Sequence, residues 1–506
     1  MKQNFIQSFF TVLAFICVSM AFGQTGKIKG TVTNKSGSPE ENVKISVTGP
    51  STGVAMTNAS GLYEIPNLKD GQYQLKFEKV GFESTSLSVS ITGGATVQGN
   101  VAFGLSEKTT GEIVVIGYGT TRSKDLTGSA TVINEKNFLK GSIATPEQLL
   151  MGKVAGLKVT SNDGAPGSGS TLRLRGGTSL NASNDPLIVV DGVPLDNGGI
   201  AGAANPLSLI NPNDIASFVV LKDASATAIY GSRGANGVII ITTKKGSGLQ
   251  DEVRITFDTK TSVSTIAKYA DVLSADSLRA LVNRKGTNAQ KLLLGTANTD
   301  WQREVFRNAL VTDNNVSITG GIKKLPYRLS VGNRYENGLL KRDNMNRTSF
   351  NLSLTPTLLD GALKLEMNQK VVQSRSFFAN RGALGAAFFD PTQPVYSGND
   401  TQYGGYFEWI DNNKPNTLSA RNPLGLIMQS EDKSIVNRLI GNLKASYALP
   451  FLPQVKAVVN VGTDQSEGIG FTKTLASSAA GYFTQGRYCE YRQTKGNRLI
   501  EAYANY

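Results

Sequence analysis

The sequence predicts a mainly β protein that is divided into several domains. The chain has 506 residues, of which 40% are hydrophobic, so it is long enough for more than one buried core. Glycine occurs 54 times, phenylalanine 21 times and tyrosine 16 times, whereas charged residues make up only 18%. This composition favours many strands and turns over long helices. In order, the patterns predict a β-sandwich, a mixed α+β domain and strands of a transmembrane β-barrel.

The chain contains no histidine, and this absence excludes several kinds of active site. A Ser-His-Asp triad, a Cys-His pair and a histidine-liganded metal site all need that side chain. Two cysteines, Cys17 and Cys489, cannot build a disulfide framework or a zinc ribbon. The net charge of +13 is scattered without a basic block, so nucleic acid is not expected as a partner. We expect no catalytic residue, no metal and no cofactor.

The first 23 residues have the pattern of a cleavable signal peptide. Lys2 precedes an apolar run over residues 9–22, and Ala21 and Gly23 are small residues just before Gln24. The run is shorter than the ~20 residues of a spanning helix, and Cys17 lacks the small preceding residue of a lipoprotein signal. We expect the mature chain to begin at Gln24. Because no later stretch could form a spanning helix, a membrane location would require a β-barrel.

Residues 24–107 predict a small antiparallel β-sandwich. Apolar and polar residues alternate in short runs that are separated by turn pairs such as Ser60-Gly61 and Asp70-Gly71. The runs are GKIKGTVTN, NVKISVTG, VAMTN, LYEIPNL, GQYQLKFEK, SLSVSI and ATVQGNVAF. No catalytic constellation is present, so we interpret this domain as a spacer or docking module.

Residues 108–125 form a linker with a short apolar strand. Ile113, Val114, Val115 and Ile116 lie between Glu112 and Gly117, and polar residues on both sides predict a strand without a local partner. Such a strand can bind another protein by adding to the edge of its sheet. An ordinary edge strand of a neighbouring domain is an equally good interpretation of these residues alone.

Residues 126–246 predict a compact α+β domain. Residues 146–154 are helix-like, LRLRGG and LIVVDGVP each predict a strand followed by a turn, and an Asn-Pro-Asn-Asp cap precedes a predicted helix up to residue 228. The segment SRGANGVIIITTKKG predicts a glycine-rich turn and a buried strand. Neither a phosphate loop nor a dinucleotide-binding fingerprint matches this turn.

Residues 247–506 have the pattern of a transmembrane β-barrel. Leu329 and Val331 alternate with Arg328 and Ser330, and the same alternation recurs in LSLTP, LKLEMN and LKASYA. The predicted connections alternate between short (320–326, 355–361, 448–453) and long (265–311, 336–346, 375–432, 467–497). Short periplasmic turns and long external loops are typical of outer-membrane barrels.

We expect about eight barrel strands, of which RLIEAYANY is the last. A barrel of ~8 strands is filled by its own side chains, whereas plugged transporters have ~22 strands. A preceding domain of this size would not fit inside the smaller barrel. The chain is therefore expected to hold only the first strands of a barrel that continues beyond Tyr506. The alternative is a complete small barrel with the α+β domain outside it.

Several long motifs resemble the SusC/RagA family of TonB-linked outer-membrane receptors. They are EIVVIGYGTTRSKDLTGS, PEQLLMGKVAGLKVTSNDGAPG, LRLRGGTSLNASNDPLIVVDGVP, INPNDIASFVVLKDASATAIYGSRGANGVIIITTKKG and NTDWQREVF. The resemblance covers the mature chain and corresponds to the N-terminal half of a typical member. It implies a carboxypeptidase-regulatory-like domain at 24–107, in which Gly37 to Val43 depart from the usual turn pattern, then a TonB box and linker at 108–125. A TonB-dependent receptor plug at 126–246 and a partial, normally 22-stranded barrel at 247–506 follow.

The resemblance also assigns residues. Glu112, Ile113, Val114, Val115 and Ile116 match the TonB box. The plug motifs are Arg173, Arg175, Gly176, Asp191, Gly192, Tyr230, Gly231, Gly234 and Gly237. We expect the two arginines to be structural, paired with acidic barrel residues. Aromatic residues of a predicted external loop, namely Tyr403, Tyr406, Phe407 and Trp409, are candidates for stacking on a ligand.

The implied function is nutrient import across the outer membrane of a Gram-negative bacterium, with the N-terminal domains in the periplasm. The partners would be TonB with its inner-membrane motor proteins and a SusD-like surface lipoprotein, and the substrate would be a glycan or a peptide. Siderophore uptake is the alternative within transport. A secreted binding or adhesion protein is the alternative outside it. An enzyme is disfavoured, because neighbours such as Glu40 and Glu41 point to opposite faces of a strand.

Overall fold

The structure is a computed structural model of the chain. It describes residues 25–34, 38–79, 84–103, 113–116, 119–122, 130–141, 143–161, 163–176, 183–196, 198–203, 205–223, 227–246, 253–398 and 402–506. The chain divides into two compact units, residues 1–114 with 121–125, and residues 115–120 with 126–506. The predicted signal peptide and Glu112 lie outside the described residues.

The first unit contains the predicted β-sandwich, but the sandwich is not purely antiparallel, because β7 and β8 pair with β1 in parallel. One sheet has the order β4-β1-β7 with β8 also on β1, and the other has the order β3-β2-β5-β6. Their inner faces share one apolar core, to which β5 contributes Tyr73, Leu75 and Phe77. The bounds are β1 Gly26–Asn34, β2 Lys44–Thr48, β3 Gly53–Met56, β4 Leu62–Leu68, β5 Gly71–Glu78, β6 Thr85–Ile91, β7 Thr96–Gln98 and β8 Val101–Phe103. Every predicted run is thus a strand, and the last run holds two.

The expected lone strand has a partner. β9 (Ile113–Ile116) and β10 (Gly119–Arg122) form a two-stranded sheet. The prediction that this strand lacks a local partner is therefore wrong.

The second unit contains the predicted α+β domain, called here the plug. Its five-stranded sheet has the order β11-β16-β17-β14-β15, in which only β14 and β17 are parallel, and β12 and β13 form a separate hairpin. The bounds are β11 Ala130–Asn134, β12 Leu157–Ser161, β13 Ser170–Leu174, β14 Leu187–Val190, β15 Val193–Pro194, β16 Ile215–Leu221 and β17 Val238–Thr243. Short 3-10 helices connect them at Glu135–Asn137, Pro146–Leu150, Pro206–Leu209, Pro212–Asp214 and Ala228–Gly234.

The helix predicted up to residue 228 is wrong. Its cap is real, because the Asn211 side chain accepts a hydrogen bond from the Asn213 N–H, but only one 3-10 turn follows. Residues Ile215–Leu221 instead form β16, a strand between β11 and β17. Pairing on both edges and burial of the run FVVL outweigh the local helix signal, because helix propensity is a weak preference. The helix predicted at 146–154 is likewise reduced to the 3-10 turn Pro146–Leu150.

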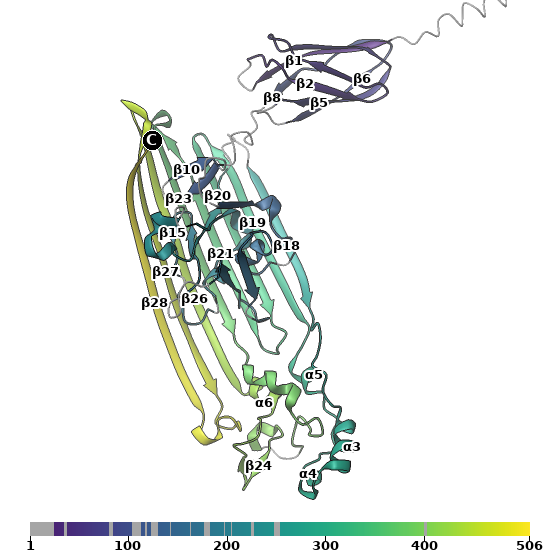
Figure 1. The fold of residues 1–506 in the computed structure, drawn as a ribbon, viewed down its shortest axis with the longest axis vertical. Coiled ribbons are helices and arrows are strands. Elements are labelled where there is room, and N and C mark those ends of the chain that lie inside the picture. Colours follow the sequence, from purple (N-terminus) through teal and green to yellow (C-terminus); the bar gives the residue numbers. More distant parts are fainter. Residues whose placement is uncertain are drawn as a thin grey trace, which may run out of the picture. The chain divides into compact units, whose positions relative to one another are not determined.

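Eight long antiparallel strands follow as one continuous wall of a partial barrel, called here the wall (Figure 1). Their order is β18-β19-β20-β21-β23-β26-β27-β28, with β22 (Thr357–Leu358) added to β23. Neighbours in sequence are neighbours in the sheet, which confirms the predicted strand count. The bounds are β18 Arg254–Ser264, β19 Ala309–Ile322, β20 Leu325–Asn337, β21 Asn344–Leu354, β23 Leu363–Phe377, β26 Ser430–Leu449, β27 Leu452–Thr474 and β28 Arg487–Asn505.

Short turns lie at one end of the wall, and the connections that follow β18, β23 and β27 at the other end are longer (Figure 1). The long loop predicted at 336–346 is wrong in extent, because β20 and β21 leave only residues 338–343 between them. The predicted long loop at 467–497 is wrong in extent, because β27 and β28 continue in register to Thr474 and Arg487. The longer connections contain α3 Ala275–Lys285, α4 Asn288–Leu292, α5 Trp301–Val305, α6 Pro423–Met428, β24 Ile410–Asp411 and β25 Lys414–Pro415, and 3-10 turns lie at Leu359–Gly361, Arg381–Phe388, Gln402–Gly405 and Tyr482–Thr484. Among the described residues, no helix has the length and apolar character needed to cross a membrane.

Candidate functional site: the contact between plug and wall

The wall turns its polar side chains toward the plug and its apolar side chains away from it. On β20, Ser330 and Arg334 are buried, whereas Val331 and Tyr335 are 46% and 38% exposed. The alternation that the sequence predicts is therefore confirmed, with the polar half on the inside. A lipid-facing barrel requires this orientation, because its outer face meets hydrocarbon.

Asp214 of the plug is held by two side chains of β20. Its Oδ1 accepts a hydrogen bond of 2.8 Å from Arg328 and one of 2.6 Å from the Ser330 hydroxyl. The Arg328 and Asp214 side chains are only 5% and 6% exposed. A buried carboxylate requires such partners, because an unpaired charge in this position would be strongly destabilising.

Asp191 links the plug sheet to β23. The residue begins the tight turn between β14 and β15, where Asp191 and Gly192 have φ angles of 47° and 87°. Its carboxylate accepts hydrogen bonds from the N–H (2.9 Å) and the hydroxyl (2.7 Å) of Thr243, and it is ion-paired with Lys370 of the wall. Burial raises the pKa of Asp191, but Lys370 and Thr243 lower it more, so the pKa is shifted downward. Asp191 is thus a buried anion shared by plug and wall.

Arg438 of β26 provides a third connection. It makes two hydrogen bonds of 2.8 Å with Asp464 of β27 and donates a third, of 2.9 Å, to the carbonyl oxygen of Pro206 in the plug. Asp464 also accepts the backbone N–H of Asp196 at 3.1 Å. Arg438 and Asp464 are therefore paired with each other, and each also binds a backbone group of the plug.

Arg347 of β21 binds the plug through backbone carbonyl groups. Its guanidinium group donates to the oxygens of Ser208 (2.7 Å), Ala144 (3.2 Å) and Ile210 (3.3 Å). The residue is only 2% exposed. It joins two separate plug segments to one wall strand.

A smaller apolar contact accompanies these polar ones. Val372 and Val436 of the wall pack with Leu209 and Ile200 of the plug, and Ile440 joins the plug core. Inside the plug, the buried Glu147 accepts hydrogen bonds from the Ser170 N–H (2.8 Å) and Asn205 (3.2 Å), and burial raises its pKa.

The expected barrel partners of the two predicted arginines are wrong, and their structural role stays a prediction. Arg173 pairs with Asp185, and Arg175 pairs with Asp223 at 2.5 Å. Both carboxylates belong to the plug and not to the barrel. The arginines protrude from a plug hairpin toward neighbouring plug loops, so local loop carboxylates are nearer to them than the wall.

The predicted plug glycines mostly stand where the backbone requires them. Gly176, Gly192, Gly231 and Gly237 all have positive φ angles, which residues other than glycine rarely adopt. Gly234 is different, because a Cβ atom there would lie 2.9 Å from the Thr227 carbonyl oxygen. Tyr230 lies in the same 3-10 segment, Ala228–Gly234, and its Cβ is close to Gly234.

The external-loop aromatics pack against one another. Tyr403 is 5% exposed and contacts Tyr482 edge to face, and Phe407 and Trp409 pack on the loop core around Trp301. Tyr406 is half-buried and lies 5.2 Å from Tyr396, between ring centroids. Tyr396, which the sequence did not single out, is more exposed, at 57%. The structure thus gives Tyr403 a packing role, and stacking of Tyr403, Tyr406 and Trp409 on a ligand stays a prediction.

The wall residues that hold the plug could not be identified from the sequence alone. Arg328 was recognised only as a polar position of an alternating strand, and Lys370, Arg347 and Arg438 were not singled out. The available signal was an excess of basic residues at the polar positions of barrel strands. A lysine or arginine side chain that points into the barrel is buried and needs hydrogen-bond acceptors there, and a plug domain supplies them.

Two family models match the chain. Residues 27–104 match the Carboxypeptidase regulatory-like domain, and residues 122–238 match the TonB-dependent Receptor Plug Domain. The chain is 40% identical to the TonB-dependent receptor SusC of Bacteroides thetaiotaomicron over 92% of its own length and 47% of that protein. It is 31% identical to the TonB-dependent receptor P3 of Formosa agariphila, over 96% of this chain and 46% of that protein. The chain thus spans about half the length of the curated relatives it matches.

A solved structure has the same fold. The RagAB peptide importer in its open-open state superposes with a TM-score of 0.64 at 22% identity, over 77% of this chain and 46% of that one. The chain therefore belongs to the SusC/RagA family of TonB-dependent receptors, whose N-terminal domain, plug and first barrel strands it contains.

Proposed function

We propose that the protein is a TonB-dependent transporter that imports an oligosaccharide or a peptide across the outer membrane. The observation that carries this proposal is the polar contact between plug and wall. Asp214 with Arg328, Asp191 with Lys370, and the Arg438 contacts are hydrogen bonds and ion pairs. Water that enters as the plug moves can replace such partners, whereas an extensive apolar interface would resist separation. The interface is suited to a plug that is displaced and returns.

TonB would provide the force through the strand Ile113–Ile116. An apolar β-branched strand upstream of the plug can bind TonB by adding to its sheet. In a two-stranded sheet, β9 is paired with β10 on one edge. TonB would therefore add to the other edge of β9 or replace β10. A pull on this strand is transmitted along the chain to β11, the first strand of the plug sheet.

The relatives support the proposed substrate class and outer partner. One structural neighbour is described as a peptide importer, which supports a peptide. A glycan is the other substrate class that the resemblance to the SusC/RagA family implies, and membership of this family supports a SusD-like surface lipoprotein as the outer partner. Transport assays with labelled oligosaccharides and labelled peptides would separate these two substrate classes.

The test concerns backbone pairing at β9. Val114→Pro combined with Val115→Pro removes two consecutive N–H donors, which point to opposite edges of the strand. We expect loss of TonB capture and of substrate-dependent growth, with unchanged outer-membrane levels. Val114→Ala with Val115→Ala is the matched control, because it shortens the side chains and keeps both donors. Normal uptake in the proline variant would contradict the proposed coupling.

A further inference from the structure

One segment of the plug lies along the inner face of β27. This segment, called here the docked segment, comprises residues 192–196, 198–203 and 205–206. Its contacts follow the order of the strand, namely Gly192 with Asn460, Val193 with Gly462, Asp196 with Asp464, and Ala201 with Gly468. The eight steps from Asn460 to Gly468 span about 27 Å, which is enough for an extended peptide of about eight residues.

Glycine residues of β27 allow this close approach. Gly462 and Gly468 are an even number of positions apart, so both lie on the inner face. A Cβ atom at Gly462 would lie 2.9 Å from Cγ2 of Val193, and one at Gly468 would clash with the carbonyl oxygen of Ala201. The docked segment therefore rests directly on the backbone of the wall at two positions. The β27 strip is defined here as Asn460, Gly462, Asp464, Ser466 and Gly468.

Two wall side chains accept backbone N–H groups of the docked segment. Asp464 accepts the Asp196 N–H at 3.1 Å, and Gln493 of β28 accepts the Ala201 N–H at 2.8 Å. Every residue except proline can provide such a donor. Recognition at these two positions therefore does not depend on the side chain of the bound residue.

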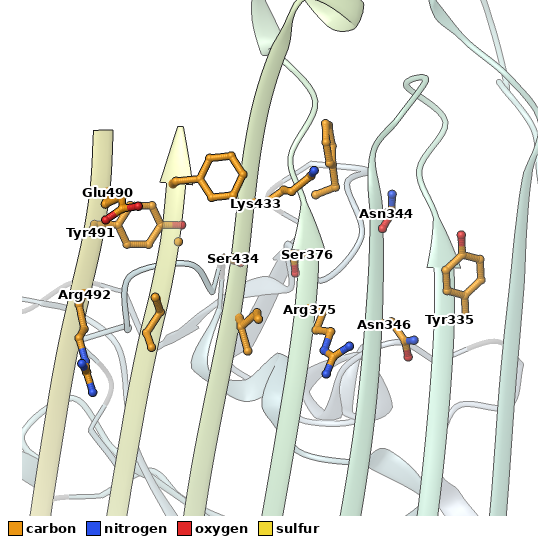
Figure 2. Close-up of a pocket in the computed structure, with 15 residues that line it drawn as sticks. Tyr335, Asn344, Asn346, Arg375, Ser376, Lys433, Ser434, Glu490, Tyr491 and Arg492 are labelled. Carbon is orange, nitrogen blue, oxygen red and sulfur yellow. The ribbon is translucent and has the colours of Figure 1, made fainter. Parts of the chain in front are cut away.

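Two further side chains donate to backbone carbonyl groups of the docked segment. Ser434 of β26 donates to the Gly202 oxygen at 2.7 Å, and Arg438 of the same strand donates to the Pro206 oxygen at 2.9 Å. Figure 2 shows Ser434 near the long-loop end of the wall. Both donors are buried. Together with the two acceptors, they match both polar groups of a peptide backbone.

We propose that the β27 strip binds the backbone of an extended peptide in transit when the docked segment leaves it. The docked segment is then a built-in substitute for the transported peptide. The exchange replaces each lost hydrogen bond with a new one, so buried groups such as the Ser434 hydroxyl are not left unsatisfied. This inference rests on the proposed transport function. It selects a peptide over an oligosaccharide, because the contacts are complementary to N–H and C=O groups.

The experiment measures peptide binding to the complete protein, produced from its natural gene and purified from outer membranes. The probe is a fluorescent synthetic peptide with the sequence of residues 192–206, and anisotropy follows its binding. Ile200→Asp with Ala201→Pro gives the released variant, in which docking is weakened. Ile200 packs with Val436 of the wall, and the Ala201 N–H binds Gln493, so both changes remove contacts of the docked segment and none of the strip.

We expect the released variant to bind the probe and wild type to bind it at least about tenfold more weakly, because the docked segment competes for the strip. A second probe has ester oxygens in place of the nitrogens of Asp196 and Ala201, which removes two donors and keeps the shape of the chain. It should bind roughly 30-fold more weakly, from about fivefold for each hydrogen bond.

Variants of the wall provide an independent comparison. Ser434→Ala with Gln493→Ala, added to the released variant, should also weaken binding roughly 30-fold. Gln373→Ala with Gln465→Ala is the matched control, because both residues lie on the outer face of the wall. Equal binding of the ester probe or by the Ser434→Ala with Gln493→Ala form would overturn the proposal. Displacement of the probe by maltoheptaose would also overturn it, because the strip would then bind a glycan.

A measurement in cells does not depend on the released variant. Ser466→Cys introduces a thiol on the strip, and Cys489→Ser removes a native one. A probe with a thiol-reactive disulfide should cross-link to Ser466→Cys only in cells that contain TonB, and the ester probe should do so much less. No TonB-dependent cross-link would overturn the proposal. Uptake without a cross-link counts against the strip alone, whereas probe binding by the purified protein without uptake counts against transport alone.

Discussion

The β-sandwich and the wall use the same alternating pattern but bury opposite halves of it. In the sandwich, β5 buries Tyr73, Leu75 and Phe77 and exposes the polar residues between them. In the wall, β20 and β21 bury Arg328, Arg334 and Arg347 and expose Val331 and Phe350. Alternation therefore defines two faces of a strand but does not determine which face is inside. The surrounding medium decides, because water selects a polar exterior and lipid an apolar one.

The opposite burial also changes how each region is held together. The sandwich is stabilised by apolar contacts, which are undirected and scale with buried area. The wall and plug are joined largely by buried ion pairs with defined partners. Loss of one partner from such a pair leaves the other as an unpaired buried charge. We therefore expect the wall to lose more stability when one charge is removed than when a neutral side chain is replaced by one of the same shape.

The largest expected effect concerns Asp191. Lys370→Met leaves this carboxylate buried without its cation, and we expect the plug to lose about 3–5 kcal/mol of stability. Urea-dependent proteolysis of the plug in purified protein measures the loss. Asp191→Asn combined with Lys370→Met is the control, because it removes both charges and should recover much of the stability. No recovery in the double variant would show that Lys370 acts through packing rather than charge.

The next effect tests the outer face of the wall. Leu443 lies on β26 within the apolar band and is 48% exposed, and Leu443→Arg should cost about 2–4 kcal/mol during membrane insertion. Asn437→Arg on the same strand replaces a polar residue nearer the long loops and should cost about 1 kcal/mol or less. Heat-modifiable mobility and folding yield in vesicles measure both. Equal costs at the two positions would contradict an apolar band that ends between Leu443 and Asn437.

The smallest effect concerns Glu408 in the external loop, where an apolar core is again on the inside. Glu408 is 7% exposed, accepts one hydrogen bond of 3.1 Å from the Asn422 N–H, and lies 3.9 Å from Arg421. Burial raises its pKa to about 7 from 4.5, despite the opposing effects of Asn422 and Arg421. The folded loop therefore holds a proton that the unfolded loop releases between pH 4.5 and 7.

Loop stability should be greatest below pH 4.5, fall by up to about 3 kcal/mol as the pH rises through this window, and remain low above it. Glu408→Gln should remove the pH dependence and stabilise the loop at pH 8. Hydrogen exchange of residues 402–429 at pH 5 and pH 8 measures this. Asp411→Asn, an exposed carboxylate in the same loop, is the control and should leave the dependence unchanged. Identical exchange of wild type and Glu408→Gln at pH 8 would refute the prediction.

Prediction from the sequence succeeded where the signal was local. The alternation around Leu75 and Val331 identified the sandwich and the wall strands, and Asp191-Gly192 predicted a tight turn whose φ angles the structure confirms. Prediction failed where contacts with distant segments determine the local structure. The run Ile215–Leu221 follows a real helix cap, yet it becomes a strand because β11 and β17 pair with its two edges.

The candidate site shows the same division. The plug motifs were located from the sequence, but the partners of Arg173 and Arg175 were not, because loop carboxylates reach them only in the folded plug. The cations that hold the plug, such as Lys370 and Arg438, lie far along the chain from Asp191 and Pro206. A one-dimensional pattern holds no information on which of many wall cations meets which plug acceptor.

The sequence by itself therefore determined the strand periodicity, the turn positions and the membership of a receptor family, because each depends on residues that are close along the chain. The tertiary structure decided which half of each alternating strand is buried and which charges pair across the plug and wall. These features depend on strand register and on the medium around each face, and both are set only when distant segments meet.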